Sequence, residues 1–361
     1  MKLEANCKST AMGIMPHKDI CTAIGLSLGL DIPFWPQLPN VSLYEDMYVQ
    51  ASQNFPGIAV DTENERLRFH TERFHEELDN YFEKSVDSAT FSLSPEYSVV
   101  YHEFLKHDLS EYSAIRGQVT GPVSFGMKVL DENLKPIIYD DEVRGVLFDF
   151  LQAKINTQYQ ELKRNNPQCF VWVDEPGLSG VFSALVGYND LQAKEDYQSF
   201  MQGLDGIRGI HLCANVDLPY LLDLGVDILS FDAYQLEFMP KEYAQSVAEF
   251  IGEGGIISWG IVPTTSSLRR YTAQSLAKLL SGYWDEVSKN TGIDCKQIAE
   301  QALLAPARCC LRIIADLDET EPSFSAQGDA SPFSSEEEVV ETAFTLVREV
   351  SVILRDEYRI N

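Results

Sequence analysis

The sequence is poor in basic residues. Its 361 residues include 28 lysines and arginines against 55 aspartates and glutamates, which gives a net charge of −27. A surface this acidic repels phosphate backbones and anionic lipid headgroups, so neither nucleic acid nor a membrane surface is an expected partner. The chain also lacks any run of 18 apolar residues, and its first 19 residues lack the unbroken apolar stretch of a secretory signal. We therefore expect a cytoplasmic protein.

Several common site motifs are also absent. Neither GxGxxG nor GxxxxGK[ST] occurs in the chain, so nothing indicates a nucleotide cofactor, and no GxSxG elbow indicates a serine nucleophile. The seven cysteines are an odd number, and 45% hydrophobic residues supply a full core without disulfides. We therefore expect reduced thiols, some of them available for chemistry.

Short apolar segments alternate with helical segments along most of the chain. Residues 169–173 form a continuous apolar run that ends at Asp174, Glu175 and Pro176, as expected for a buried parallel strand. This alternation predicts an α/β fold with a parallel sheet. A single (β/α)₈ TIM barrel suits this length best, and a doubly wound open sheet is the alternative. Further strands are expected within 115–126, breaking at Gly121-Pro122, and at 207–213, 227–231 and 255–262, with helices at 98–108, 141–164, 218–224, 241–252, 273–291 and 294–304.

Two segments depart from this alternation. Residues 31–39 are too rich in proline for a helix or a central strand, so we expect a packed loop there. Residues 316–338 mix acids with Ser, Pro and Gly, which indicates a mobile surface loop, and one helix is expected after it at 339–358. We predict one domain over residues 1–361, a barrel with an N-terminal extension and an acidic loop before the C-terminal helix.

One pair of residues has the spacing of metal ligands. His211 and Cys213 lie two residues apart at a strand end, where both side chains face the same way. Asp232 closes the next strand, and Cys309 lies near the expected last strand. This set of nitrogen, sulfur and carboxylate donors suits Zn²⁺, and zinc held by two thiolates and an imidazole favours alkylation of a third thiolate over hydrolysis. The alternative is a buried reduced cysteine pair without metal.

A second candidate is the carboxylate pair Asp174 and Glu175. Two carboxylates at a strand end can bind a cationic group such as an α-ammonium, or act as an acid and base pair. The alternative is a solvated turn or a helix cap. Among the other histidines, we retain as a candidate only His17, which directly follows Met15-Pro16.

The ordered set of motifs resembles a known family. The segments TAMGIMPH (10–17), TGPV (120–123), VDEPGL (173–178), HLC (211–213), DILSFD (227–232) and CCL (309–311) are similar to the C-terminal catalytic barrel of cobalamin-independent methionine synthase. The order and approximate spacing agree over some 300 residues. The chain resembles most the short core methionine synthases, which lack the N-terminal barrel of the long enzyme, within the uroporphyrinogen decarboxylase-like superfamily.

The resemblance implies zinc ligands. His211, Cys213 and Cys309 match the family's ligands, and Asp232 stands where the family has a glutamate one methylene longer. The last motif has one extra residue before Cys309, and Cys310 replaces the usual glycine, so Cys310 is an alternative ligand. The fourth ligand is then either Asp232 or a water.

The resemblance also implies a substrate site for homocysteine. Asp174 inherits the role of binding its amino group, with Glu175 beside it. The family's Ile-Gly-Ser motif is here Met12-Gly13-Ile14, so only backbone contacts to the amino acid remain at Gly13 and Ile14.

Two departures from the family bear on the methyl donor. The catalytic histidine that follows one strand in the long enzymes is missing after residues 258–264, and their GlyGluxxArg segment is replaced by the segment at 36–39. We therefore expect the methyl group to come from methylcobalamin on a corrinoid protein, because the cobalt–carbon bond needs no protonation. The expected activity is zinc-dependent transfer of a methyl group to homocysteine, giving methionine.

Three alternatives stay open. One is transfer to another thiol such as coenzyme M, and another is a metal-free decarboxylase of the uroporphyrinogen type. The first 60 residues contain no arginine, which argues against a substrate rich in carboxylates. The third is a non-catalytic relative that binds corrinoid.

Overall fold

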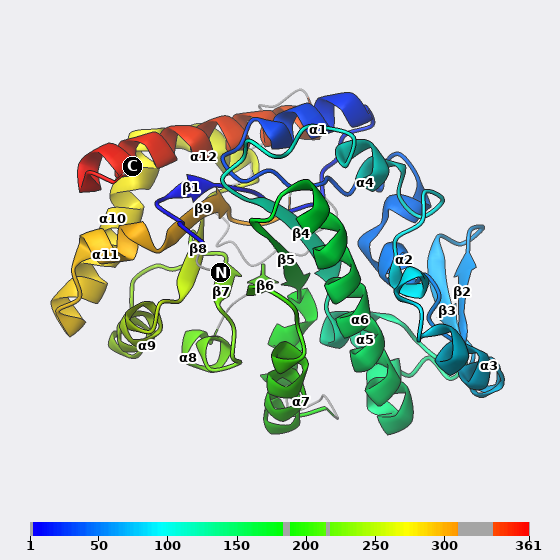
Figure 1. Ribbon diagram of the computed structural model, residues 1–361. Helices are drawn as coiled ribbons and strands as arrows, with labels where there is room; N and C mark the ends of the chain where they lie inside the picture. Colours follow the sequence, from blue (N-terminus) through cyan, green and yellow to red (C-terminus); the bar gives the residue numbers. More distant parts are fainter. Residues whose placement is uncertain (1–2, 183–187, 214–216, 310–334, 361) are drawn as a thin grey trace, which may run out of the picture.

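The computed structural model describes residues 3–182, 188–213, 217–309 and 335–360. A parallel sheet of seven strands curls through its centre in the order β1-β9-β8-β7-β6-β5-β4 (Figure 1). The strands are β1 (Lys8–Ser9), β4 (Ile115–Thr120), β5 (Cys169–Asp174), β6 (Arg208–Leu212), β7 (Ile228–Phe231), β8 (Ile256–Val262) and β9 (Ala302–Pro306).

The proline-rich segment at 31–35 occupies the gap between the two edges of this sheet. The Ile32 amide donates to the Ser9 carbonyl of β1 at 3.0 Å, and the Arg116 amide of β4 donates to the Pro33 carbonyl at 2.9 Å. Phe34 forms an isolated parallel bridge with Arg116. Because both edge strands bond to the same segment, the sheet is a barrel-like ring with eight positions, and the predicted TIM-type fold is confirmed over a doubly wound open sheet.

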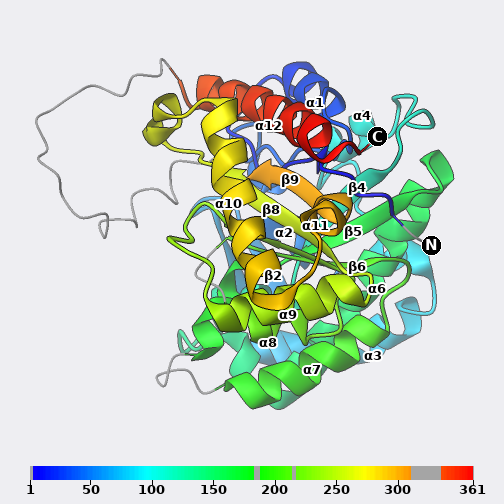
Figure 2. The ribbon, with the colours of Figure 1, turned by 90° about the vertical axis from the view of Figure 1, so that its left-hand side faces the viewer.

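Helices cover the outer face of the ring, and in both views the last helix lies beside the first (Figures 1 and 2). The helices at 241–252 and 273–291 match the prediction. Those at 20–28 and 190–202 were not predicted, and residues 122–126, part of the segment expected to be a broken strand, belong to a helix. The helices around the ring are α1 (Ile20–Leu28), α4 (Val99–Phe104), α5 (Pro122–Lys128), α6 (Asp141–Asn165), α7 (Asp190–Gln202), α8 (Leu218–Leu222), α9 (Lys241–Gly252), α10 (Ala273–Thr291), α11 (Cys295–Glu300) and α12 (Glu336–Tyr358). Among the described residues, no helix has the length and apolar character needed to cross a membrane.

One predicted helix is partly wrong. The structure ends α11 at Glu300 and then places β9 where residues 302–304 were expected to be helical. A short apolar run suits a buried helix or a buried strand equally well, and its neighbours decide between them. Here β8 and β1 offer hydrogen-bonding partners on both sides.

Additional elements lie between the segment at 31–35 and β4, to the side of the ring (Figure 1). They are α2 (Met47–Ser52), the antiparallel hairpin β2 (Ile58–Asp61) and β3 (Arg66–Phe69), and α3 (Thr71–Lys84). Short 3₁₀ turns join the elements at Leu43–Glu45, Ser88–Phe91, Ile137–Tyr139, Pro176–Phe182 and Ser266–Arg270. Most of the predicted acidic loop at 316–338 lies outside the described residues.

The inside of the ring changes character along its axis. Its amino-terminal part is a small apolar cluster that includes Phe170, Trp172, Ile228, Ile256 and Leu303. Towards the carboxyl ends of the strands, alternate inward positions become polar. Buried polar side chains there are Arg116, Gln118, Thr120, Asp174, His211, Ser230, Asp232 and Ser258. This polar end is where a barrel of this type carries its chemistry.

Candidate metal centre

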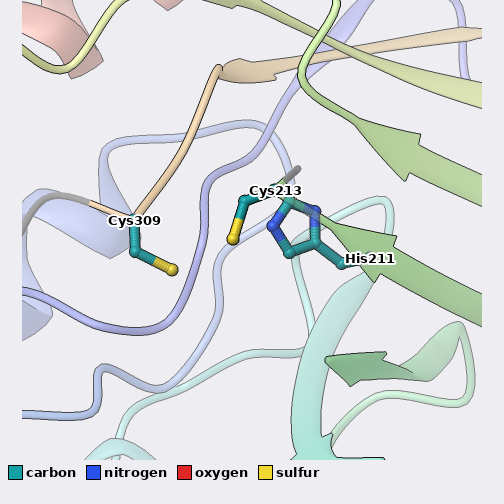
Figure 3. Close-up of side chains that lie close together, drawn as sticks. All are labelled: His211, Cys213 and Cys309. Carbon is teal, nitrogen blue, oxygen red and sulfur yellow. The ribbon is translucent and has the colours of Figure 1, made fainter. Parts of the chain in front are cut away.

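Three side chains that are distant in sequence meet at the carboxyl end of the ring. His211 lies one residue before the end of β6, Cys213 follows two residues later on the same side, and Cys309 lies three residues beyond the end of β9. One ligand atom from each lies within 4.8 Å of the others, and no other such group occurs in the part of the chain that the structure describes. In Figure 3 the sulfur of Cys309 points towards Cys213, whose side chain lies beside the His211 ring.

Of the two ring nitrogens of His211, one has a hydrogen-bond partner and the other has none among the described residues. Its Nδ1 lies 3.0 Å from the hydroxyl of Ser230, the residue opposite it on β7. Its Nε2 is buried without a hydrogen-bond partner among the described residues. The ring also stacks on Trp172 with 5.9 Å between centroids and 18° between planes. A histidine fixed in this way by a neighbour at one nitrogen presents the other as a metal ligand.

The thiols of the cluster differ from the deeply buried ones elsewhere. The neighbouring Cys309, and then the His211 ring, lower the pKa of Cys213 well below its usual value, against the opposing effect of burial. Burial instead raises the pKa values of Cys7 and Cys169 to about 12, and each donates to a backbone carbonyl. Because the thiolate is the reactive and metal-binding form, the cluster is better suited to bind a metal than the two buried thiols are.

Asp232 lies close by but is not in the cluster. Its Oδ2 accepts from Nε of Arg308 at 2.7 Å, and its Oδ1 accepts from the Gln235 amide at 3.2 Å. Burial raises its pKa to about 6, against the opposing effect of Arg308. The carboxylate at the position of the expected fourth ligand is therefore engaged by the residue next to Cys309. The alternative ligand Cys310 lies outside the described residues.

Asp174 offers a buried carboxylate with no side-chain hydrogen bond to any described residue. It ends β5 opposite His211, and the residue is 8% exposed. Burial raises its pKa to about 6, and the neighbouring His211 and Arg116 act in the opposite direction. An uncommitted carboxylate beside the cluster can accept hydrogen bonds from a bound cation.

Glu175 has a different environment. One oxygen accepts from the Val123 amide and the Tyr197 hydroxyl, both at 3.0 Å, and the other accepts from the amide and hydroxyl of Ser124 at 2.7 and 2.5 Å. Burial raises its pKa to about 7. A Cβ on Gly121 would lie 2.1 Å from Oε1, so that glycine makes room for the carboxylate. Glu175 thus joins the start of α5 to β5, and its expected contact with a substrate stays a prediction.

The loop at 10–17 runs from β1 to α1 and carries Gly13 and Ile14. The Gly13 carbonyl accepts from the Gln37 amide at 2.7 Å, and the Met15 amide donates to the Gln37 carbonyl at 3.0 Å. The amides of residues 12–14 donate to no described acceptor. His17, at the end of the loop, is 1% exposed, and neither of its ring nitrogens has a described partner.

Sequence reasoning missed three residues around the cluster. Burial and the charges of Glu175, Asp46, Cys213 and Cys309 raise the pKa of Tyr48, so its phenol on α2 stays protonated near the cluster. The other two are Trp172 and Arg116, which lie inside the ring. A signal for Arg116 was present, because polar residues at 116, 118 and 120 alternate with apolar or small residues along this buried strand.

Comparison with solved structures finds likenesses at low sequence identity. A methyltransferase from Methanosarcina mazei is 15% identical, with a TM-score of 0.55 over 99% of this chain and 95% of that one. The two chains share a fold. A B12-independent methionine synthase from a Shewanella species is 15% identical, with a TM-score of 0.44 over 68% of this chain. A putative vitamin-B12-independent methionine synthase from Listeria monocytogenes is 16% identical, with a TM-score of 0.43 over 69% of this chain and 67% of that one.

The match spans 63% of the length of the Shewanella protein. No protein-family model matches the chain, and no curated protein matches it.

Proposed function

We propose that this protein is a zinc-dependent thiol methyltransferase. The observation that carries the proposal is the convergence of His211, Cys213 and Cys309 at the carboxyl end of the ring. The donor set fits zinc, because two thiols and an unpartnered, buried imidazole nitrogen are ligands that zinc prefers. Zinc bound there would keep an incoming thiol deprotonated at neutral pH.

The acceptor we propose is homocysteine. Asp174 lies on the strand next to His211, and its carboxylate has no hydrogen-bond partner among the described residues, so it is available to accept from an α-ammonium group. The backbone amides of Gly13 and Ile14, which also lack acceptors within the described part of the chain, are suited to the carboxylate of the same amino acid. This pairing favours an amino-acid thiol over coenzyme M, which has no ammonium group.

The donor we propose is a methylated corrinoid, carried by a partner protein that docks at the open end of the ring. The electron pair of the homocysteine sulfur forms the new bond to the methyl carbon. The electron pair of the cobalt–carbon bond stays on cobalt, so cob(I)alamin leaves and no proton is consumed. In agreement with this, β8 is followed by Pro263, Thr264 and Thr265, which include no histidine or carboxylic acid. A folate donor, in contrast, needs a proton on its leaving amine.

The decisive assay incubates the purified protein with free methylcobalamin and homocysteine and follows cob(I)alamin by its absorbance. We expect stoichiometric zinc by metal analysis and methyl transfer from methylcobalamin but not from methyl-folate. Coenzyme M in place of homocysteine tests the alternative acceptor.

A pair of serine variants locates the chemistry. Cys213→Ser should lose zinc and methyl transfer, because it removes one of three protein ligands. Cys21→Ser changes an exposed thiol on α1 outside the cluster and should retain both. A Cys213→Ser protein that keeps its metal and its activity would refute the proposal.

A further inference from the structure

Arg116 is a fully buried cation inside the ring. It projects inward from β4, with 0% of the residue exposed. Its guanidinium donates to the carbonyls of Gly117 and Ala11 and to the side-chain oxygen of Gln118. Its Nε is buried without a partner among the described residues. Every acceptor that it contacts is therefore neutral.

This charge is not neutralised by direct pairing. No described carboxylate lies within salt-bridge distance of the guanidinium, although burying a charge without an ionic partner costs several kcal/mol. The negative groups that act on it most are Asp174 and Cys309, which lie at the candidate metal centre. The guanidinium of Arg116 therefore has neutral hydrogen-bond partners, and the nearest negative charges that act on it belong to that centre.

An aromatic ring connects Arg116 to the centre. The guanidinium carbon lies 4.0 Å from the centroid of the Trp172 ring, and the same indole stacks on His211. A Cβ on Gly209 would lie 2.4 Å from Cδ1 of Trp172, so the absence of a side chain there leaves room for the indole. The stack of Arg116, Trp172 and His211 crosses three neighbouring strands.

The net charge expected at the metal centre with substrate bound indicates a role for the stack of Arg116, Trp172 and His211. Two cysteinates would balance a divalent ion, so a bound substrate thiolate would add one net negative charge beside the buried His211 ring. Resting on the function proposed above, we propose that Arg116 is a positioning residue that offsets the negative charge of the bound substrate thiolate and, through Trp172, holds the His211 ring in place. Because the guanidinium is already fixed in place, it can stabilise the thiolate without any rearrangement of the protein.

The test compares two ligands that differ in charge at sulfur. Homocysteine binds as a thiolate, whereas methionine offers a neutral thioether on the same amino-acid frame. Their affinities for the metal-loaded protein are measured by calorimetry, with Co²⁺ in place of zinc for a second, optical readout of thiolate binding. We expect Arg116→Met to weaken homocysteine binding about tenfold and methionine binding less than about twofold. Arg116→Lys, which keeps the charge, should restore most of the homocysteine affinity.

Lys154→Met is the matched control. Lys154 is also buried, on α6, and its amine donates to the Gln53 carbonyl at 3.4 Å, away from the centre. Its removal should affect folding stability without changing the ratio of the two affinities. The thermal unfolding temperature of each variant shows whether a lower affinity comes from a less stable fold or from the lost charge.

The outcomes distinguish the two proposals. Wild-type protein that binds neither metal nor homocysteine overturns the proposed function and this inference with it. Wild-type protein that binds both, together with an Arg116→Met variant whose affinity ratio is unchanged, overturns the inference alone. An equal loss for both ligands in Arg116→Met has the same meaning, because it shows a packing role without charge selectivity.

Discussion

At the scale of single residues, side chains of the same type differ in their hydrogen bonds and pKa values because their surroundings in the fold differ. Asp174 and Glu175 are adjacent acids, yet the Glu175 carboxylate accepts four hydrogen bonds from the protein and the Asp174 carboxylate accepts none from a described residue. The cysteines separate in the same way, since Cys7 and Cys169 are buried with raised pKa values and Cys213 has a lowered one. Local sequence does not reveal these partners, because Val123, Ser124 and Tyr197 lie on other elements and Cys309 is distant in the chain from Cys213.

The free carboxylate of Asp174 predicts a pH dependence of substrate binding. Because burial raises its pKa to about 6, the group is charged at pH 7 and becomes neutral as the pH falls through about 6. Homocysteine affinity should fall with it, since a neutral acid attracts an ammonium group weakly. Asp174→Asn should weaken homocysteine binding about 10-fold to 100-fold at pH 7.5.

Coenzyme M is the control ligand for this prediction, because it carries a thiol without an ammonium group. Its binding should respond little to Asp174→Asn. Equal losses for both thiols, measured by competition at pH 7.5, would show that Asp174 does not recognise the amino group.

At the scale of elements, most strands and helices were predictable from local pattern. The apolar run of β5 and its polar end, and the amphipathic spacing of α6, α9 and α10, identified these elements within a residue or so. The prediction was wrong at β9, where a short apolar segment became a strand because β1 and β8 bond to it from both sides. Short buried elements are set by their neighbours more than by their own propensity.

The close contact between Gly209 on β6 and Trp172 on β5 predicts how one added methyl group changes the stability of the protein. Gly209→Ala should destabilise the protein by about 1–3 kcal/mol, because its Cβ would lie 2.4 Å from the Trp172 ring. Gly282→Ala, in the interior of α10 with nothing within 4 Å of the new Cβ, should stabilise it by about 0.5–1 kcal/mol. Denaturant unfolding measures the change in the free energy of unfolding of each variant. Equal changes would contradict the close packing of Gly209 against Trp172.

At the scale of the whole molecule, closure of the ring depends on contacts between distant parts of the chain. The Asp31 carboxylate accepts from the amide and hydroxyl of Ser9 on β1 at 2.8 and 2.7 Å, and from Arg355 on α12 at 2.8 Å. Arg355 also donates to the Asn6 carbonyl at 3.0 Å. One acid thus ties together the first strand, the proline-rich segment and the last helix.

Removal of this acid should weaken the closure. We expect Asp31→Ala to lower the free energy of unfolding by about 2 kcal/mol, because three hydrogen bonds to a charged group are lost at a half-buried site. Lys296→Ala, which removes a surface pair at 3.9 Å from Glu300, should change it by less than about 0.5 kcal/mol. Urea denaturation compares the two variants, and equal losses would show that Asp31 contributes no more than a surface charge.

The sequence by itself determined many of the strands and helices and the strand ends that carry His211, Cys213 and Asp174, because those features follow from local hydrophobic pattern and from the alternation of faces along a strand. Only the tertiary structure decided that a proline-rich segment takes the eighth position of the ring. It also decided that Asp232 pairs with Arg308 and that a buried guanidinium packs on the Trp172 ring, which in turn stacks on His211 of the candidate metal centre. Each of these depends on groups that come together only when the ring closes, and charges and hydrogen bonds act through distance in space rather than along the chain.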